Sequence, residues 1–223
     1  MELIILMRRW MLRNGPGLIV MNMSIRKRIW WKILAFILAA ALAAAVGIYG
    51  WQKGAFLPDW IVWQEKRQTV EEESGEILLK ERNLTLKKDG KAVWKSPKEI
   101  LVQDFLWCDI NHDTKEELIL LCWRIGRYGD AKPFWIEEDE KQWSQHIYIY
   151  QWAAEEVHPL WMASDIGMEA AGFSFDEKKR LEITETNGRV TYWDWMSWGL
   201  TLIGEEDSEN TLQGRASSND NIT

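Results

Sequence analysis

A run of 19 residues without a charge or a proline constrains this chain more than any other feature of its sequence. The run spans residues 33–51 and reads ILAFILAAALAAAVGIYGW. About 20 apolar residues are needed to cross the ~30 Å hydrocarbon core of a bilayer as a helix. Trp30 and Trp31 precede the run, and Tyr49 and Trp51 close it, as in the two aromatic belts of a membrane span. The sequence therefore predicts one transmembrane helix over residues 33–51.

The basic residues around this run indicate its orientation. Four of them lie within positions 26–32, whereas Lys53 is the only one shortly after the run. Because the more basic flank stays in the cytoplasm, we expect a single-pass protein of the cell membrane with a cytoplasmic N-terminus and an extracytoplasmic C-terminal domain. A signal peptide cleaved near residues 43–45 is the alternative. The apolar run continues beyond these residues to Trp51, which favours an uncleaved signal-anchor.

Composition divides the rest of the chain. Residues 1–32 are expected to form a basic cytoplasmic tail, in which residues 1–22 are assigned no fold and fit either an over-called start codon or a short tail. Residues 52–75 are expected to be a linker, and residues 76–204 a β-rich domain. Residues 205–223 are rich in Ser, Asn, Asp and Gly, and we expect a disordered tail there.

Charge is distributed unevenly along the chain. Residues 1–58 carry 8 Lys and Arg against one Glu, whereas residues 59–223 carry 19 Lys and Arg against 33 Asp and Glu. Nucleic-acid binding needs clustered cations to neutralise phosphates. The acidic composition of the larger part therefore excludes nucleic acid as its partner.

Beyond the membrane span, the hydrophobic pattern changes to short alternating segments. Residues 76–80, 83–87 and 146–150 are rich in β-branched and aromatic side chains, and turns such as Lys88-Asp89-Gly90-Lys91 separate such segments. The pattern predicts an all-β domain of antiparallel sheets. Further strands are expected at residues 101–108, 117–124, 156–161, 168–175, 180–185, 190–195 and 199–203.

One polar loop, DINHDTKEE at residues 109–117, lies between two of these predicted strands. Its first, third, fifth and ninth positions carry carboxylate or amide oxygens, and a backbone carbonyl at the seventh position would add one more. Such an oxygen cage suits Ca²⁺ rather than Zn²⁺. The ligand positions are Asp109, Asn111, Asp113, Lys115 and Glu117. An EF-hand is excluded because both flanks are strand-like, and a solvated acidic turn is the remaining alternative.

The string DINHDTKEEL, residues 109–118, resembles the D-x-[DN]-x-D-G-x-x-[DE]-L signature of FG-GAP and VCBS-type repeats. Such repeats form the blades of integrin-like β-propellers and hold calcium in a hairpin loop. The resemblance therefore implies propeller-blade-like antiparallel sheets and the same five calcium ligands. Thr114 stands where these repeats have a glycine, which adopts positive φ most easily. We therefore expect calcium binding to be weak.

A degenerate second copy of this unit follows. A shift of 63 residues aligns Asp113 with Asp176, whereas the position of Glu117 becomes Arg180, which would neutralise Asp176. We expect no calcium there, and chance similarity of two β-rich hairpins is the alternative. Two such units cannot close a propeller ring of four to eight blades. An incomplete propeller, a compact sandwich and assembly between chains are therefore all open.

The first unit alone contains a long insertion, residues 124–145, between two predicted strands. It is much longer than the two to five residues of an ordinary hairpin loop. Aromatic side chains on long ordered loops commonly bind ligands. We therefore expect a glycan or protein ligand at the cell surface to contact Tyr128, Phe134, Trp135 and Trp143. The alternative is that Phe134 and Trp135 only cover the edge of the sheet.

No catalytic constellation is apparent in the sequence. His112, His146 and His158 lie apart, and no Ser or Cys stands in a recognisable nucleophile setting. Cys108 and Cys122 are expected to miss each other across their hairpin and to be buried free thiols. We expect a non-catalytic, calcium-stabilised binding or adhesion module rather than an enzyme. An enzyme accessory or sensor that processes envelope polysaccharide through the insertion is the alternative.

Overall fold

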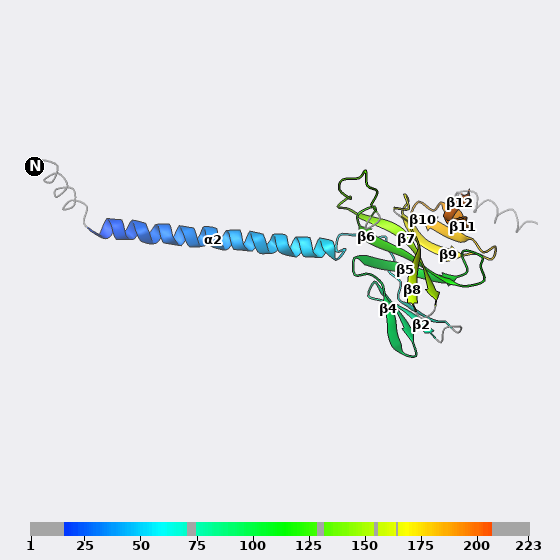
Figure 1. Cartoon of the computed structure of the whole chain (residues 1–223). Helices are drawn as coiled ribbons and strands as arrows, with labels where there is room; N and C mark the ends of the chain where they lie inside the picture. The colour runs from blue at the N-terminus through cyan, green and yellow to red at the C-terminus, as the bar shows by residue number, and fades with distance from the viewer. Residues whose placement is uncertain (1–15, 71–74, 129–131, 154–155, 164, 207–223) are drawn as a thin grey trace, which may run out of the picture. The chain divides into compact units, whose positions relative to one another are not determined.

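The structure is a computed structural model and describes residues 16–70, 75–128, 132–153, 156–163 and 165–206. The chain divides into two compact units, one ending at Phe56 and one beginning at Leu57. The first unit contains helix α2, and the second, here named the β unit, contains strands β1 to β12 (Figure 1).

Helix α2 spans Pro16–Gln52, which is 37 residues. Its part from Arg28 to Gln52 is long and apolar enough to cross a membrane, although a signal sequence has the same features. Within residues 28–52 most large apolar side chains are exposed, as in Phe36 and Leu42. The expected apolar helix is confirmed, but it begins at Pro16, inside the segment 1–22 that was assigned no fold, rather than at residue 33. Residues 1–15 lie outside the described residues.

The β unit consists of three four-stranded antiparallel sheets, each built from strands that follow one another in sequence. Sheet A contains β1 (Lys66–Val70), β2 (Gly75–Lys80), β3 (Asn83–Lys88) and β4 (Lys91–Lys95). Sheet B contains β5 (Ile100–Cys108), β6 (Glu117–Ile125), β7 (Trp143–Ala153) and β8 (Glu156–Met162). Sheet C contains β9 (Ala170–Phe175), β10 (Leu181–Glu185), β11 (Val190–Met196) and β12 (Gly199–Glu206). The predicted all-β class is confirmed.

Two strands of sheet A were not predicted. Strand β1 lies in the expected linker, yet it pairs along its length with β2, and β4 pairs with β3. Both are edge strands with mostly exposed side chains, so neither shows the apolar alternation of a half-buried strand. The expected disordered tail is also shortened, because β12 extends to Glu206. Residues 207–223 lie outside the described residues.

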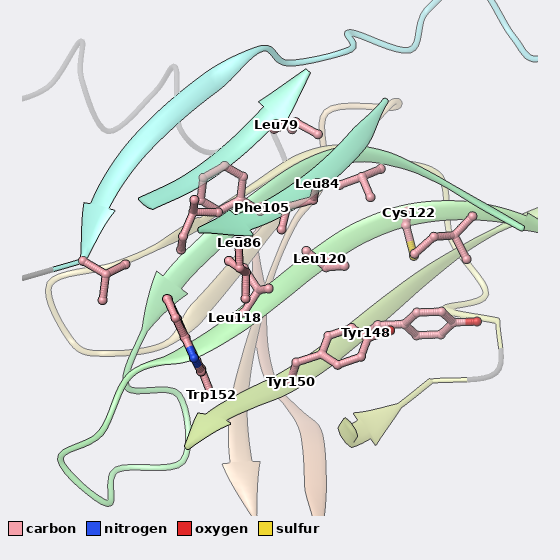
Figure 2. Packing of buried hydrophobic residues seen from close by; sticks show 14 residues of the cluster. Leu79, Leu84, Leu86, Phe105, Leu118, Leu120, Cys122, Tyr148, Tyr150 and Trp152 are labelled. Carbon is pink, nitrogen blue, oxygen red and sulfur yellow. The ribbon is translucent and has the colours of Figure 1, made fainter. Parts of the chain in front are cut away.

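Sheet B lies between the other two sheets and buries both of its faces. Leu118 and Leu120 of β6 belong to a core shared with sheet A, in which Leu84 of β3 is also buried (Figure 2). Ile119 and Leu121, which alternate with them, belong to a second core shared with sheet C. Every described residue of both cores belongs to the β unit. This unit therefore contains the apolar interior that it needs to fold without α2.

The two flanking sheets carry charged side chains away from the cores. On sheet A, Glu76 forms ion pairs with Arg67 at 3.0 Å and with Lys87 at 3.2 Å. On sheet C, the Arg180 guanidinium lies over the ring of Tyr192, 4.0 Å from its centroid. Sheet C also has exposed apolar side chains, among them Met196 and Leu202.

Candidate functional site

The acidic loop at residues 109–117 connects β5 to β6, and Cys108 pairs with Glu117 at its base. Two of its non-glycine residues have positive φ, His112 at 61° and Thr114 at 75°. Thr114 therefore adopts the left-handed conformation for which the related signature uses glycine. For a β-branched residue this conformation is strained.

Hydrogen bonds within the loop fix its shape. The Oδ1 atom of Asn111 accepts the backbone N–H of Asp113 at 2.9 Å, and Oδ1 of Asp113 accepts the N–H of Lys115 at 2.8 Å. These are two successive Asx turns. Nδ2 of Asn111 donates to Oε1 of Glu117 at 3.1 Å. Four of the five predicted ligand residues are thus linked, and their side-chain oxygens accept hydrogen bonds from within the loop.

Glu117 is a fully buried carboxylate. Burial, together with the negative charges of Asp113 and Asp109, raises its pKa to about 7 against the opposing effect of hydrogen bonds from Ile110 and Asn111. The backbone N–H of Ile110 donates to its Oε2 atom at 3.2 Å. Near neutral pH the protonated and ionised forms of this carboxylate therefore coexist, and a bound cation would favour the ionised form.

The two carboxylate oxygens of Asp109 differ: one forms an ion pair, and the other has no hydrogen-bond partner among the described residues. Its Oδ2 atom lies 3.6 Å from Nζ of Lys179, which comes from the turn between β9 and β10. Its Oδ1 atom is buried and has no hydrogen-bond partner among the described residues. A buried oxygen without a partner is costly and is a place where an ion or water is expected.

The described side chains do not form a ready metal site. No group of three or more His, Cys, Asp or Glu residues in the described ranges could hold a metal ion. The carboxylates of Asp109, Asp113 and Glu117 therefore do not converge on one point. Calcium would require these three groups to move together, with the Asn111 amide and the Lys115 carbonyl completing the ligand set.

The insertion between β6 and β7 is braced by a residue that the sequence analysis did not single out. Oδ1 of Asp139 accepts the backbone N–H groups of Arg127 at 2.8 Å, Tyr128 at 3.2 Å and Glu140 at 2.8 Å. Gly126 has φ of 97°, and a Cβ atom there would collide with the Asp139 carboxylate. One carboxylate thus connects the two ends of the insertion, and Gly126 makes room for it.

The insertion presents two aromatic rings to solvent. Phe134 is 94% exposed and Trp135 is 69% exposed, and their rings meet edge to face with centroids 4.8 Å apart. The alternative that they cover the edge of the sheet is therefore wrong. Tyr128 lines a separate cavity of about 430 Å³, together with Arg124. Trp143 lines an open depression elsewhere on the surface. The four predicted aromatic residues are therefore not brought together.

His112 and His158 are exposed, whereas His146 and both cysteines are buried. Nε2 of His112 lies 2.7 Å from Oδ1 of Asp194, and Nε2 of His158 lies 3.2 Å from Oε2 of Glu156.

His146 is fully buried, with Nε2 2.9 Å from Oγ of Ser144 and Nδ1 3.1 Å from the carbonyl oxygen of Ala163. Cys108 and Cys122 are free and buried, as expected. Burial raises the pKa of the Cys108 thiol to about 12, with further contributions from nearby carboxylates, so this thiol is unreactive at neutral pH.

Comparison with known proteins gives no family assignment. No known protein family matches the chain by its sequence profile. A search of curated proteins finds no significant match. A proposal for the function therefore depends on the residues and geometry of the chain itself.

Proposed function

We propose that the chain is a membrane-anchored, non-catalytic binding or adhesion module whose β unit lies outside the cytoplasm. In this proposal α2 is an uncleaved anchor with its N-terminus inside the cell. The observation that carries the proposal is the exposed pair Phe134 and Trp135, held on a loop that Asp139 braces. Large aromatic side chains at such exposure are costly unless they contact a partner.

The chemistry of the insertion suits glycans or peptides. The edge-to-face arrangement of Phe134 and Trp135 offers two ring faces. Glu137 and Glu138 follow one residue later, with carboxylates that accept hydrogen bonds. Because backbone hydrogen bonds hold the loop, little conformational entropy would be lost when a ligand binds. Aromatic anchors with polar surroundings are the usual composition of a binding hot spot.

Calcium is the second part of the proposal. Its support is the resemblance of residues 109–118 to the FG-GAP and VCBS signature, in a loop that joins the first two strands of a four-stranded sheet. The unpartnered oxygen of Asp109 and the buried carboxylate of Glu117 would each gain a partner from a cation. On calcium binding, oxygens that now accept hydrogen bonds within the loop would instead coordinate the ion, which would link the end of β5 to the start of β6.

A binding experiment tests the favoured function. The 223-residue chain in polyoxyethylene-detergent micelles is applied to glycan and peptide arrays, alongside a Phe134→Ala/Trp135→Ala double variant. A Phe56→Ala variant is the control, because Phe56 is 70% exposed and lies outside the insertion. We expect the double variant alone to lose binding.

Two outcomes would overturn the proposal. Equal binding by all three proteins would show that the aromatic pair is not the ligand surface. Release of soluble sugar from an envelope polysaccharide would instead favour the polysaccharide-processing alternative.

A further inference from the structure

A cavity of about 370 Å³ lies between sheets B and C, away from the acidic loop and the tip of the insertion. We name it the tryptophan pocket, because Trp161, Trp193 and Trp198 line it. Its other described lining residues are aliphatic or Met, with the exception of Asp165. A concave, mostly apolar wall with aromatic rings and one convergent polar group is typical of a small-molecule site.

The three indole rings are held by different parts of the fold. Nε1 of Trp193 donates to Oγ1 of Thr191 at 2.9 Å, which fixes that ring on β11. Trp161 lies so close to the backbone of Gly199 that a Cβ atom there would be 2.5 Å from its Nε1 atom. Two sheets therefore position these rings, which are far apart in sequence.

Trp198 forms the exposed side of the pocket. It follows Ser197, whose φ is 59°, in the turn between β11 and β12. Its side chain is 81% exposed. Because Trp198 lines the pocket and is exposed, its ring is accessible to a ligand that enters.

Asp165 is the only ionisable residue among the described residues that line the pocket. Its Oδ1 atom accepts the backbone N–H of Gly167 at 2.9 Å, which orients the carboxylate. Its Oδ2 atom forms an ion pair with Nε of Arg127 at 3.7 Å, which is longer than a direct hydrogen bond. Oδ2 therefore keeps capacity to accept a hydrogen bond, and Asp165 supplies the negative charge among the described lining residues.

We propose that the tryptophan pocket binds a quaternary ammonium group. Aromatic faces attract such cations, and indole is the most effective ring. A primary ammonium would lose hydrogen bonds to water that an apolar wall does not replace, whereas a trimethylammonium group has no N–H to satisfy. Residues 59–223, with 19 basic and 33 acidic side chains, also favour the approach of a cation.

Titration of the 223-residue chain in polyoxyethylene-detergent micelles with choline tests this proposal by calorimetry. The matched probe is 3,3-dimethylbutan-1-ol, which has the same shape as choline but no charge. We expect choline to bind at least about tenfold more tightly, because a desolvated cation–π contact contributes about 2 kcal/mol. Glycerophosphocholine is titrated separately, and the tighter of the two choline compounds identifies a free or a lipid-derived source.

Variants locate the site. Trp198→Ala and Asp165→Asn should each weaken choline binding by about tenfold. Trp198 is exposed, so its removal leaves the cores intact. Phe56→Ala, which removes an exposed aromatic side chain outside the pocket, should leave choline binding unchanged.

Several results would overturn the proposal: no choline binding by the folded chain, equal affinity for the neutral alcohol, or an equal loss in Phe56→Ala. The calcium loop takes no part in this site. Failure of calcium to bind would therefore leave the choline result unaffected.

Discussion

Arg180 forms an ion pair with Asp176 across the turn between β9 and β10. Its Nε and Nη2 atoms lie 2.8 and 2.7 Å from Oδ2 of Asp176, and its backbone N–H donates to Oδ1 at 2.8 Å. The sequence analysis predicted this neutralisation, and the ion pair confirms it. Asp113, at the corresponding position between β5 and β6, has no ion pair among the described residues. The two loops therefore differ in whether a side chain supplies the positive charge.

This difference leads to a calcium prediction. Calcium at 1 mM should stabilise the β unit by about 1.4 kcal/mol if the Kd is about 0.1 mM, within the weak range of extracellular modules. The melting temperature should then rise by about 3–6 °C. Asp113→Ala should abolish this shift, whereas Asp176→Ala should retain it, as scanning calorimetry can measure. Identical behaviour of the two variants would show that residues 109–117 form only a solvated turn.

A second prediction concerns the membrane. If α2 is an uncleaved anchor, the chain should stay in the membrane fraction after carbonate washing. Protease added outside intact cells should then remove the β unit, because the cation asymmetry around α2 favours its export. A soluble form that begins near Gly47 would instead identify a cleaved signal sequence.

The two buried faces of sheet B lead to a third prediction. Leu120→Ala and Leu121→Ala should each lower the free energy of unfolding by about 2–5 kcal/mol, because each leaves a cavity in a different core. On β3 only alternate positions are buried, so Leu84→Ala should be costly and Thr85→Ala nearly neutral. Denaturant unfolding of the β unit measures all four changes. A mild effect at either Leu120 or Leu121 would contradict the three-layer packing.

Gly126 gives a fourth prediction. Gly126→Ala should destabilise the β unit more than Gly90→Ala does, by about 1–3 kcal/mol. Both glycines have positive φ, 97° and 75°, but only at Gly126 would a Cβ atom collide, and the group it meets is Asp139. The difference between the two variants therefore isolates the steric effect from backbone strain. Equal unfolding free energies would show that Asp139 moves aside at little cost.

His146 gives a pH prediction. Burial lowers its pKa, against the effect of hydrogen bonds to backbone carbonyls, so the folded chain binds its proton less readily than the unfolded chain does. The stabilisation is complete above the unfolded value of about 6.5 and is lost as the pH falls towards the folded value. Between pH 7.5 and 5.5, the unfolding free energy should therefore fall more steeply in the parent than in His146→Gln.

Control measurements separate this effect from other titrations. Thr85→Ala on β3 changes no ionisable group, so this variant should keep the parent's pH dependence. Glu117, whose pKa is raised, titrates in all three proteins and cancels from the comparison. If His146→Gln and the parent have the same pH dependence, the buried imidazole does not contribute to acid sensitivity.

Several features follow from the sequence because each is encoded locally. The length and composition of residues 33–51 are enough to predict an apolar helix. Alternation and turn residues are enough to predict the central strands and a hairpin at residues 109–117. The pair of Asp176 and Arg180 is four residues apart, so a short alignment reveals it.

Tertiary structure decided what local patterns do not contain. Edge strands β1 and β4 lack apolar alternation, because sheet pairing rather than burial holds them. The burial of Glu117, the brace formed by Asp139 and the pocket that Trp161 and Trp198 both line depend on parts of the chain that are apart in sequence. Periodicity determines which side chains prefer the interior. Which faces meet, and which polar groups lie between them, is determined only when the three sheets pack together.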